Sequence, residues 1–219
     1  LGFKDLVQDQ RNNYKIAGAF MALQDLFNMH NGNGSAKKLS LAIISDTIVF
    51  SADAEIPNVI ENVISMTVCT IREYWEEGIL LRGAITHGKL YHEGNIVFGP
   101  ALVDAYMLER ESAVYPRVIV SEDMYQNHIA GAGFQDHFIP DPQGLRYFDY
   151  FGASMGNLLP QEFCLDLNSG KKWLEKNLTE TTENAGIHAK YEWLKNEWNN
   201  ALMNNRAHII SPIEQYMIV

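Results

Sequence analysis

The stretch from Leu39 to Ala52, LSLAIISDTIVFSA, constrains the fold more than any other part of the chain. Apolar residues that favour strands lie on both sides of a two-residue polar tip, Ser45-Asp46. This pattern predicts two antiparallel strands joined by a tight turn. A carboxylate among residues this apolar is unfavourable unless a cation or hydrogen-bond donors meet it. Asp46 is therefore interpreted either as a turn residue that caps its own backbone or as a metal ligand.

The composition is that of a soluble globular protein. The chain has 219 residues, of which 47% are hydrophobic and 20% charged, and its formal net charge is -10. This acidic balance argues against nonspecific nucleic-acid binding. No apolar run reaches the roughly 18 residues of a membrane helix, so we expect a cytoplasmic protein without a membrane partner. Cys69 and Cys164 form no metal-binding spacing and are expected to be free thiols.

Helical and strand patterns follow one another along the chain. Helical spacing of apolar residues is found before His30, from Ile56 to a stop at Gly78, from Gly99-Pro100 through ALVDAYMLERESA, in EDMYQNHI, and from Lys171 onward. Strands are predicted over Leu80 to Gly88, in a hairpin within GKLYHEGNIVFG, in RVIVS and in RYFDYFG, with a loop from Gly131 to Leu145. This order predicts an α+β fold, in which a mixed sheet carries helices on one face.

Five segments resemble the catalytic domain of class III nucleotidyl cyclases, in the same order and at similar spacing. They are LGFKDLV, AIISDTIVFSA, LLRGAITHG, NIVFGPALVDAYMLE and YPRVIVS. The chain is most similar to the Pycsar cyclases, bacterial anti-phage enzymes that make cyclic UMP or cyclic CMP. The resemblance implies a ferredoxin-like catalytic domain over residues 1–160. Residues 161–219 would then form a C-terminal strand and a helical extension packed on that domain.

The resemblance also implies a metal site and a triphosphate site. Asp46 matches the second metal-binding Asp of the family, and the first would lie before Leu1. Gly2, Phe3 and Lys4 match a turn whose backbone N–H groups meet the triphosphate, since helix N-termini favour anions. Ser45, next to Asp46, is a further candidate for substrate binding. Two Mg²⁺ or Mn²⁺ ions about 3.5 to 4 Å apart would serve as cofactors and stabilise the attacking and leaving oxygens.

Arg82 is the charged residue of its predicted strand, and a buried strand rarely keeps an Arg without a partner. Its guanidinium suits phosphate or uracil carbonyl groups, which makes Arg82 a candidate for both catalysis and substrate binding. The alternative is an ion pair with an internal acid such as Asp104.

Four positions depart from the pattern of purine cyclases. The residues that read the purine base, a Lys and an Asp, correspond here to Ala42 and Ile96, and neither can hydrogen-bond a base edge. The Asn and Arg that orient the ribose and stabilise the transition state correspond to Val103 and Met107. Arg82, Arg110 or Tyr106, which we take as a substrate-binding candidate, could supply the missing cation or polar group.

The sequence therefore predicts a homodimeric pyrimidine nucleotide cyclase in bacterial anti-phage defence. Its substrate would be UTP, or CTP as the second choice, and its product would act through a downstream effector. By resemblance, two active sites form between two head-to-tail chains. Two alternatives remain open: a purine cyclase with an unusual base pocket, and a catalytically inactive cyclase-fold module that binds a nucleotide or a partner protein.

Overall fold

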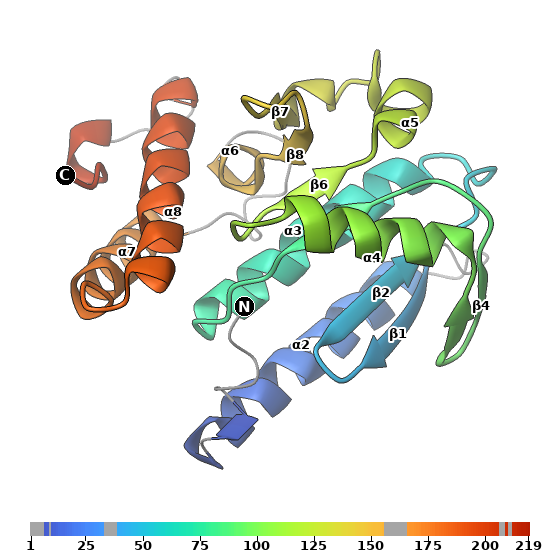
Figure 1. The fold of residues 1–219 in the computed structure, drawn as a ribbon, viewed down its shortest axis with the longest axis horizontal. Coiled ribbons are helices and arrows are strands. Elements are labelled where there is room, and N and C mark those ends of the chain that lie inside the picture. The colour runs from blue at the N-terminus through green and yellow to red at the C-terminus, as the bar shows by residue number, and fades with distance from the viewer. Residues whose placement is uncertain (1–6, 9, 33–38, 156–165, 206–208, 210–211) are drawn as a thin grey trace. The chain divides into compact units, whose positions relative to one another are not determined.

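The computed structural model describes residues 7–8, 10–32, 39–155, 166–205, 209 and 212–219. The chain forms two compact units, Leu1–Gln135 and Asp136–Val219. Helices accompany both parallel and antiparallel strand pairs, so the fold is α+β, as predicted (Figure 1). The domain boundary predicted at residue 160 falls outside the described residues. No helix within the described ranges is both long and apolar enough to cross a lipid bilayer.

The first unit holds most of the predicted elements. Its helices and helical turns are η1 (Gln10–Asn12), α2 (Asn13–Asn31), α3 (Val59–Glu76), α4 (Pro100–Ser112), α5 (Glu122–Met124) and the π-helical turn η2 (Tyr125–Ile129). Its strands are β1 (Ser40–Ile44), β2 (Thr47–Ser51), β3 (Gly83–Ile85), β4 (Tyr91–Glu93), β5 (Ile96–Phe98) and β6 (Val118–Val120). The short helical turn η3 (Gln135–His137) follows at the unit boundary.

The β1–β2 hairpin is confirmed, with Ile44 opposite Thr47 and Ser45-Asp46 as its two-residue turn. Ser45 adopts a φ of 57°, a conformation that a two-residue hairpin turn needs and that is uncommon for residues other than glycine. Because side chains alternate along a strand, this register turns Ala42 into the core, where it is fully buried. The hairpin is therefore anchored through one of its faces.

Helix α3 also follows the predicted pattern. Its buried residues recur at helical spacing: Val59, Ile64, Met66, Val68, Cys69, Thr70, Ile71, Tyr74 and Trp75. Gly78 ends the helix with a φ of 75°. The N–H of Gly78 donates to the carbonyl of Trp75, and the N–H of Ile79 donates to that of Tyr74. This pair of bonds is the Schellman motif, which satisfies the last helical carbonyls.

Strands β3 and β6 form a parallel pair in the first unit, in which Gly83 lies opposite Val118. The chain between them passes through the β4–β5 hairpin and α4, so both the hairpin and the helix predicted after Gly99-Pro100 are confirmed. The strand predicted over Leu80 to Gly88 is shorter, because only residues 83–85 pair with β6. Arg82 consequently lies just before the strand.

The second unit contains β7 (Phe138–Pro140), β8 (Arg146–Phe148), α6 (Tyr150–Met155), α7 (Leu167–Glu180), α8 (Ala185–Asn204) and the turn η6 (Ile213–Gln215). The predicted loop from Gly131 to Leu145 was wrong in part, because β7 lies within it and pairs with β8. The RYFDYFG strand ends at Phe148, because the Asp149 carboxylate accepts the N–H of Gly152 and begins α6. The helical tail is confirmed and starts earlier than Lys171, at Leu167, where Asp166 caps it.

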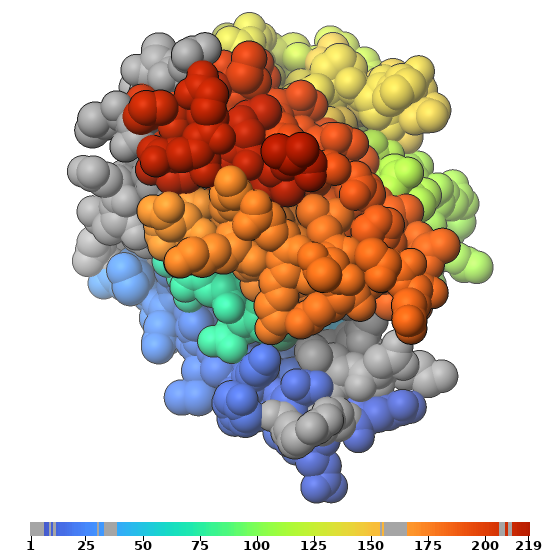
Figure 2. Space-filling view, turned by 90° about the vertical axis from the view of Figure 1, so that its left-hand side faces the viewer, coloured from blue at the N-terminus to red at the C-terminus, as the bar shows by residue number. Residues whose placement is uncertain are grey.

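Trp198 of α8 holds the α7–α8 pair and the C-terminal segment together. Its side chain is completely buried, and its indole N–H donates to the carbonyl of Tyr216 at 2.9 Å. The side chain of Asn199 bonds both backbone groups of Ile218. The C-terminal segment, red in Figure 2, therefore lies directly against the orange α7–α8 pair.

Two half-buried acids and two buried tyrosines form a second polar group in this unit. The hydroxyl of Tyr147 donates to Glu197 Oε2 at 2.9 Å. Burial raises the pKa of Tyr150 well above its usual value, and the charges of Glu197 and Asp149 act in the same direction. Burial also raises the pKa of Asp149, partly offset by the Gly152 N–H. Negative charge is thus unfavourable in this part of the core.

The packing of Trp198 predicts that Gly170 of α7 cannot be replaced by alanine. A Cβ atom on Gly170 would lie 2.6 Å from Trp198 Cη2, well inside van der Waals contact. Overpacking of this kind costs about 1–3 kcal/mol, more than the roughly 1 kcal/mol that Ala gains over Gly in a helix. Gly170→Ala should therefore lower the free energy of unfolding measured in urea.

Gly186→Ala is the matched control, because a Cβ atom there meets only Asn184 Oδ1, at 3.8 Å. It should leave the stability unchanged or raise it. Equal stability of the two variants would contradict the close packing of Gly170 on Trp198.

Candidate functional site

Asp46 lies at the exposed tip of the β1–β2 hairpin, beside the exposed Ser45. Within the described part of the chain, no side chain or backbone group makes a hydrogen bond or ion pair with the Asp46 carboxylate. It does not cap its own turn, which was one of the two interpretations. An exposed carboxylate held on a tight turn is free to take a hard cation such as Mg²⁺.

Arg82 is held by the C-terminal half of α4. Its Nε forms an ion pair with Glu109 Oε1, and its Nη1 donates to the carbonyl of Ala113 at 3.2 Å. Ala113 follows the last residue of α4, so Arg82 satisfies a carbonyl at the helix end. The alternative interpretation of Arg82, an ion pair with an internal acid, is thus correct in kind, but the acid is Glu109 rather than Asp104, which is exposed.

Tyr106 belongs to an exposed apolar face of α4. Val103, Tyr106 and Met107 are 59%, 57% and 40% exposed, and their spacing places them on one side of the helix. Arg110, one turn after Tyr106, is also exposed. Val103 and Met107 are the positions that the resemblance aligns with the Asn and Arg of purine cyclases. Their side chains, like that of Tyr106, therefore point away from the core of the unit.

The two base-reading positions lie in different environments. Ala42 is fully buried in β1, whereas Ile96 at the start of β5 is 61% exposed. Neither side chain carries a hydrogen-bonding group. Gly2, Phe3 and Lys4, predicted to meet the triphosphate, lie outside the described residues.

The structure brings Arg82 to Glu109 but not to Asp46, since the ion pairs of the described residues include none between Arg82 and Asp46. No group of three or more His, Cys, Asp or Glu side chains among these residues is arranged to hold a metal ion. Asp46 is thus the single described member of the predicted metal site.

A surface pocket of about 300 Å³ lies elsewhere in the first unit. It is lined by residues before and in the first turn of α3, together with His128, Ala132 and Phe134. Glu55 and Glu61 are among its lining residues. Two acids oppose the binding of a triphosphate, so this pocket does not suit the predicted substrate.

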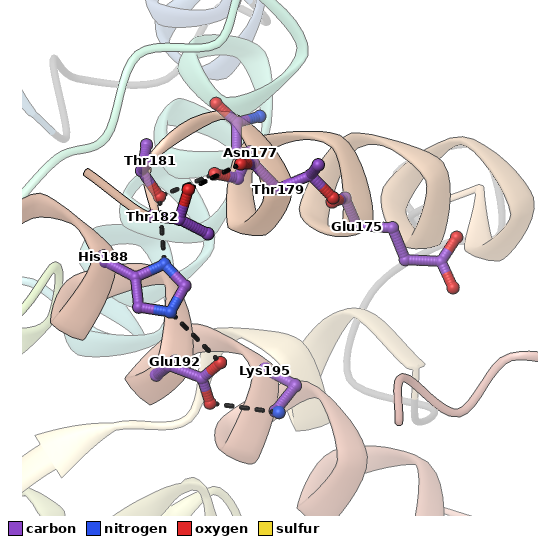
Figure 3. Close-up of polar contacts among 8 residues, drawn as sticks. All are labelled: Glu175, Asn177, Thr179, Thr181, Thr182, His188, Glu192 and Lys195. Carbon is purple, nitrogen blue, oxygen red and sulfur yellow. Dashed lines mark hydrogen bonds and ion pairs between the residues drawn. The ribbon is translucent and has the colours of Figure 1, made fainter. Parts of the chain in front are cut away.

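Two histidine contacts were not singled out from the sequence. In the first unit, His92 Nδ1 lies 2.7 Å from Ser51 Oγ and joins β4 to β2. In the second unit, a chain of polar side chains runs from Thr181 through His188 and Glu192 to Lys195 (Figure 3). Of these contacts, the sequence could have indicated only the helical spacing of His188, Glu192 and Lys195, at positions i, i+4 and i+7 of one helix.

The Thr181–His188–Glu192 arrangement has the residue types of a nucleophile, a base and an orienting acid. Thr181, however, donates its hydroxyl hydrogen to the carbonyl of Asn177 at 2.7 Å (Figure 3). His188 Nδ1, at 3.3 Å from Thr181 Oγ1, is therefore placed to donate to that oxygen rather than to accept its proton. The group stabilises the turn between α7 and α8.

The Arg82 contacts predict a measurable coupling to Glu109. Arg82→Met removes an ion pair and a bond to a helix-end carbonyl, so it should lower the free energy of unfolding by about 1 kcal/mol. Glu109→Ala, which removes the acceptor altogether, should lower it by a similar amount. A double-mutant cycle in urea should give a positive coupling energy of about 0.5 kcal/mol. Strictly additive effects would show that Arg82 is not held by Glu109 in solution.

The chain was compared with protein-family models, with curated proteins and with solved structures, and none of the three comparisons found a match.

Proposed function

We propose that this protein is a nucleotidyl cyclase that converts UTP, or CTP as the second choice, to the 3′,5′-cyclic monophosphate and pyrophosphate. The proposal rests on the class III resemblance of the five ordered segments. The structural observation that favours it is the exposed Asp46 carboxylate at the hairpin tip, which has no partner among the described residues. A carboxylate in this position is available to a divalent ion.

The reaction joins the ribose 3′-oxygen to the α-phosphorus and breaks the bond from that phosphorus to the pyrophosphate oxygen. When bound, two Mg²⁺ or Mn²⁺ ions would stabilise both oxygens. Asp46 would hold these ions, and Ser45 beside it would contact the triphosphate. On α4 of the second chain, the exposed Tyr106 and Arg110 would be the groups available to orient the ribose and offset developing charge.

A homodimer is part of the proposal, because the groups assigned to one site must meet across two chains. Exposed apolar side chains lie on the β4–β5 hairpin, at Tyr91, Ile96 and Phe98, and on α4, at Val103, Tyr106 and Met107. Exposed apolar side chains of this kind are candidates for a protein interface. By the class III resemblance, a second copy that covers these side chains would bring Tyr106 and Arg110 of one chain toward the Asp46 of the other.

The preference for a pyrimidine follows from the base-reading positions. A site that lacks hydrogen-bonding groups for the purine edge leaves that edge unpaired, which disfavours ATP and GTP. Ala42 and Ile96 are apolar, and Ala42 is also buried. Donors such as an Arg side chain favour the O4 carbonyl of uracil over the amino group of cytosine, so UTP comes before CTP.

A second candidate is a catalytically inactive cyclase-fold module that binds a nucleotide. The observation that favours it is the engagement of Arg82 by Glu109 and by the Ala113 carbonyl, which leaves this guanidinium occupied within its own unit. Calorimetry with UTP and Mn²⁺ separates the two candidates when it is combined with product analysis. Binding without cyclic product would favour the inactive module.

The catalytic proposal predicts that Asp46→Asn removes nearly all cyclic UMP formation by the full-length protein. Asn is well tolerated in turns, so the melting temperature should stay within a few degrees. Activity falls because the amide cannot replace a carboxylate as a ligand for divalent ions. Asp53→Asn is the matched control: Asp53 Oδ1 accepts the N–H of Glu55, and an Asn side chain can do the same. A fully active Asp46→Asn protein would contradict the assignment of Asp46 as a metal ligand.

A further inference from the structure

The end of α2 is tied to the start of β1 by one side chain, that of Asn31. Its Nδ2 donates to the carbonyl of Leu39 at 3.0 Å, and its Oδ1 accepts the N–H of Leu39 at 3.2 Å. Leu39 is 2% exposed and directly precedes β1. One amide group thus satisfies both backbone groups of a buried residue, which requires a donor and an acceptor on the same side chain. We call these two hydrogen bonds the Asn31 clamp.

The residue after Asn31 is fixed by a second contact. A Cβ atom on Gly32 would lie 2.7 Å from the carbonyl oxygen of Asn28, which belongs to the last turn of α2. Because that oxygen is backbone, no side-chain rotation can relieve the clash, and glycine alone fits without a shift of the helix end. The fold therefore requires an amide at position 31 and glycine at position 32. The two requirements together produce an Asn-Gly dipeptide.

An Asn-Gly dipeptide is chemically labile, because glycine has no side chain to hinder attack by its own nitrogen. The nitrogen of Gly32 forms a bond to Cγ of Asn31 and closes a cyclic imide. The bond from Cγ to the side-chain nitrogen breaks, and ammonia leaves with the proton of the Gly32 N–H. Water then opens the imide at either carbonyl and gives aspartate or isoaspartate. Gly32 is exposed and Asn31 is half-buried, so water reaches this dipeptide.

We propose that Asn31-Gly32 is a site of spontaneous deamidation, and that the conversion releases the start of β1 from the end of α2. The proposal concerns a modification site in the first unit and does not depend on the proposed cyclase activity. It makes the attachment of the β1–β2 hairpin to α2 a contact with a limited chemical lifetime.

Aspartate at position 31 cannot keep the clamp. An oxygen in place of Nδ2 has no hydrogen to donate, so the carbonyl of the buried Leu39 loses its bond and faces a second acceptor. The new negative charge also lies in the last turn of α2, where the helix dipole disfavours an anion. Isoaspartate adds a carbon to the main chain and displaces Gly32 as well. All of these changes act in the same direction.

The loss of the clamp acts on the open end of the hairpin. Leu39 directly precedes Ser40, which pairs with Ser51 at the end opposite the Ser45-Asp46 turn. The clamp is a side-chain contact that holds this end of β1 to a helix. After conversion, the backbone amides of the segment 39–44 should therefore open to solvent more often.

Peptide mapping by mass spectrometry tests the site. The folded full-length protein is incubated in mildly alkaline buffer beside a synthetic peptide of residues 27–37, which has no clamp. Aspartate and isoaspartate should accumulate at position 31 of the protein, while Asn28, which precedes Met29, stays intact. Fragment spectra separate position 31 from Asn33-Gly34, the other Asn-Gly of the sequence. An intact Asn31 in the protein after the peptide has converted overturns the proposal.

Hydrogen–deuterium exchange tests the release of β1. In Asn31→Asp, the segment 39–44 should exchange several-fold faster than in the wild type. Asn28→Asp is the matched control, because it adds the same charge to the same helical turn and can still accept from Gln24, as Asn28 Oδ1 does at 3.3 Å. This control should leave exchange of the segment 39–44 at the wild-type rate.

The deamidated fraction of the aged wild-type protein, separated by ion exchange, gives the same comparison without relying on a variant. It should exchange over residues 39–44 as Asn31→Asp does. The release of β1 is overturned if the deamidated protein exchanges at the wild-type rate. It is also overturned if Asn28→Asp accelerates exchange as much as Asn31→Asp, because the effect would then come from charge rather than from the clamp.

Discussion

The two-residue turn at Ser45-Asp46 is the constraint on which the rest of the account depends. Ser45 adopts a positive φ, and this sets Ile44 opposite Thr47 and every following pair of the hairpin. A shift of the strand register by one residue would turn each side chain to the other face of the hairpin, so that Ala42 would leave the core. The same turn presents the Asp46 carboxylate to solvent. A single local geometry thus determines both how the hairpin is anchored and where its acid can act.

The two residues proposed for catalysis, Asp46 and Arg82, differ in whether they have partners within the described part of the chain. Asp46 has no partner in the described part of the chain, whereas Arg82 is occupied by Glu109 and by the end of α4. A cation that already neutralises a carboxylate is a weak donor to a phosphate unless it exchanges partners. Arg110, on the exposed side of α4, forms no ion pair with another described residue and so needs no such exchange. The geometry therefore favours α4 itself, rather than the segment before β3, as the source of positive charge in the proposed shared site.

Much of the fold follows from local pattern. The β1–β2 turn, the glycine end of α3 and the Gly99-Pro100 start of α4 all lie where the sequence predicts them, because each depends on residues within a few positions. The β7 strand was missed, because its pairing with β8 lies in a stretch rich in glycine, proline and aspartate that reads as loop. Arg82 was placed inside a strand because the apolar run around it is longer than the pairing with β6.

The candidate site was harder to derive, because contacts between distant segments carry no local signal. The pairing of Arg82 with Glu109 depends on where α4 ends relative to β3, and the Ser51–His92 contact joins two hairpins that periodicity alone cannot place together. The spacing of Val103, Tyr106 and Met107 was visible in the sequence, but their exposure was not. An apolar helical face normally indicates a core, and here it lies on the surface.

Product analysis with a mixture of nucleotides tests the central claim most directly. The full-length protein would be incubated with equimolar ATP, GTP, CTP and UTP and with Mn²⁺, and the cyclic nucleotides would be quantified by mass spectrometry. The account predicts that cyclic UMP dominates, because Ala42 and Ile96 offer a purine edge no hydrogen-bonding partner. Dominant cyclic CMP would correct only the choice of pyrimidine. Dominant cyclic AMP or cyclic GMP, or no cyclic product at all, would contradict the account.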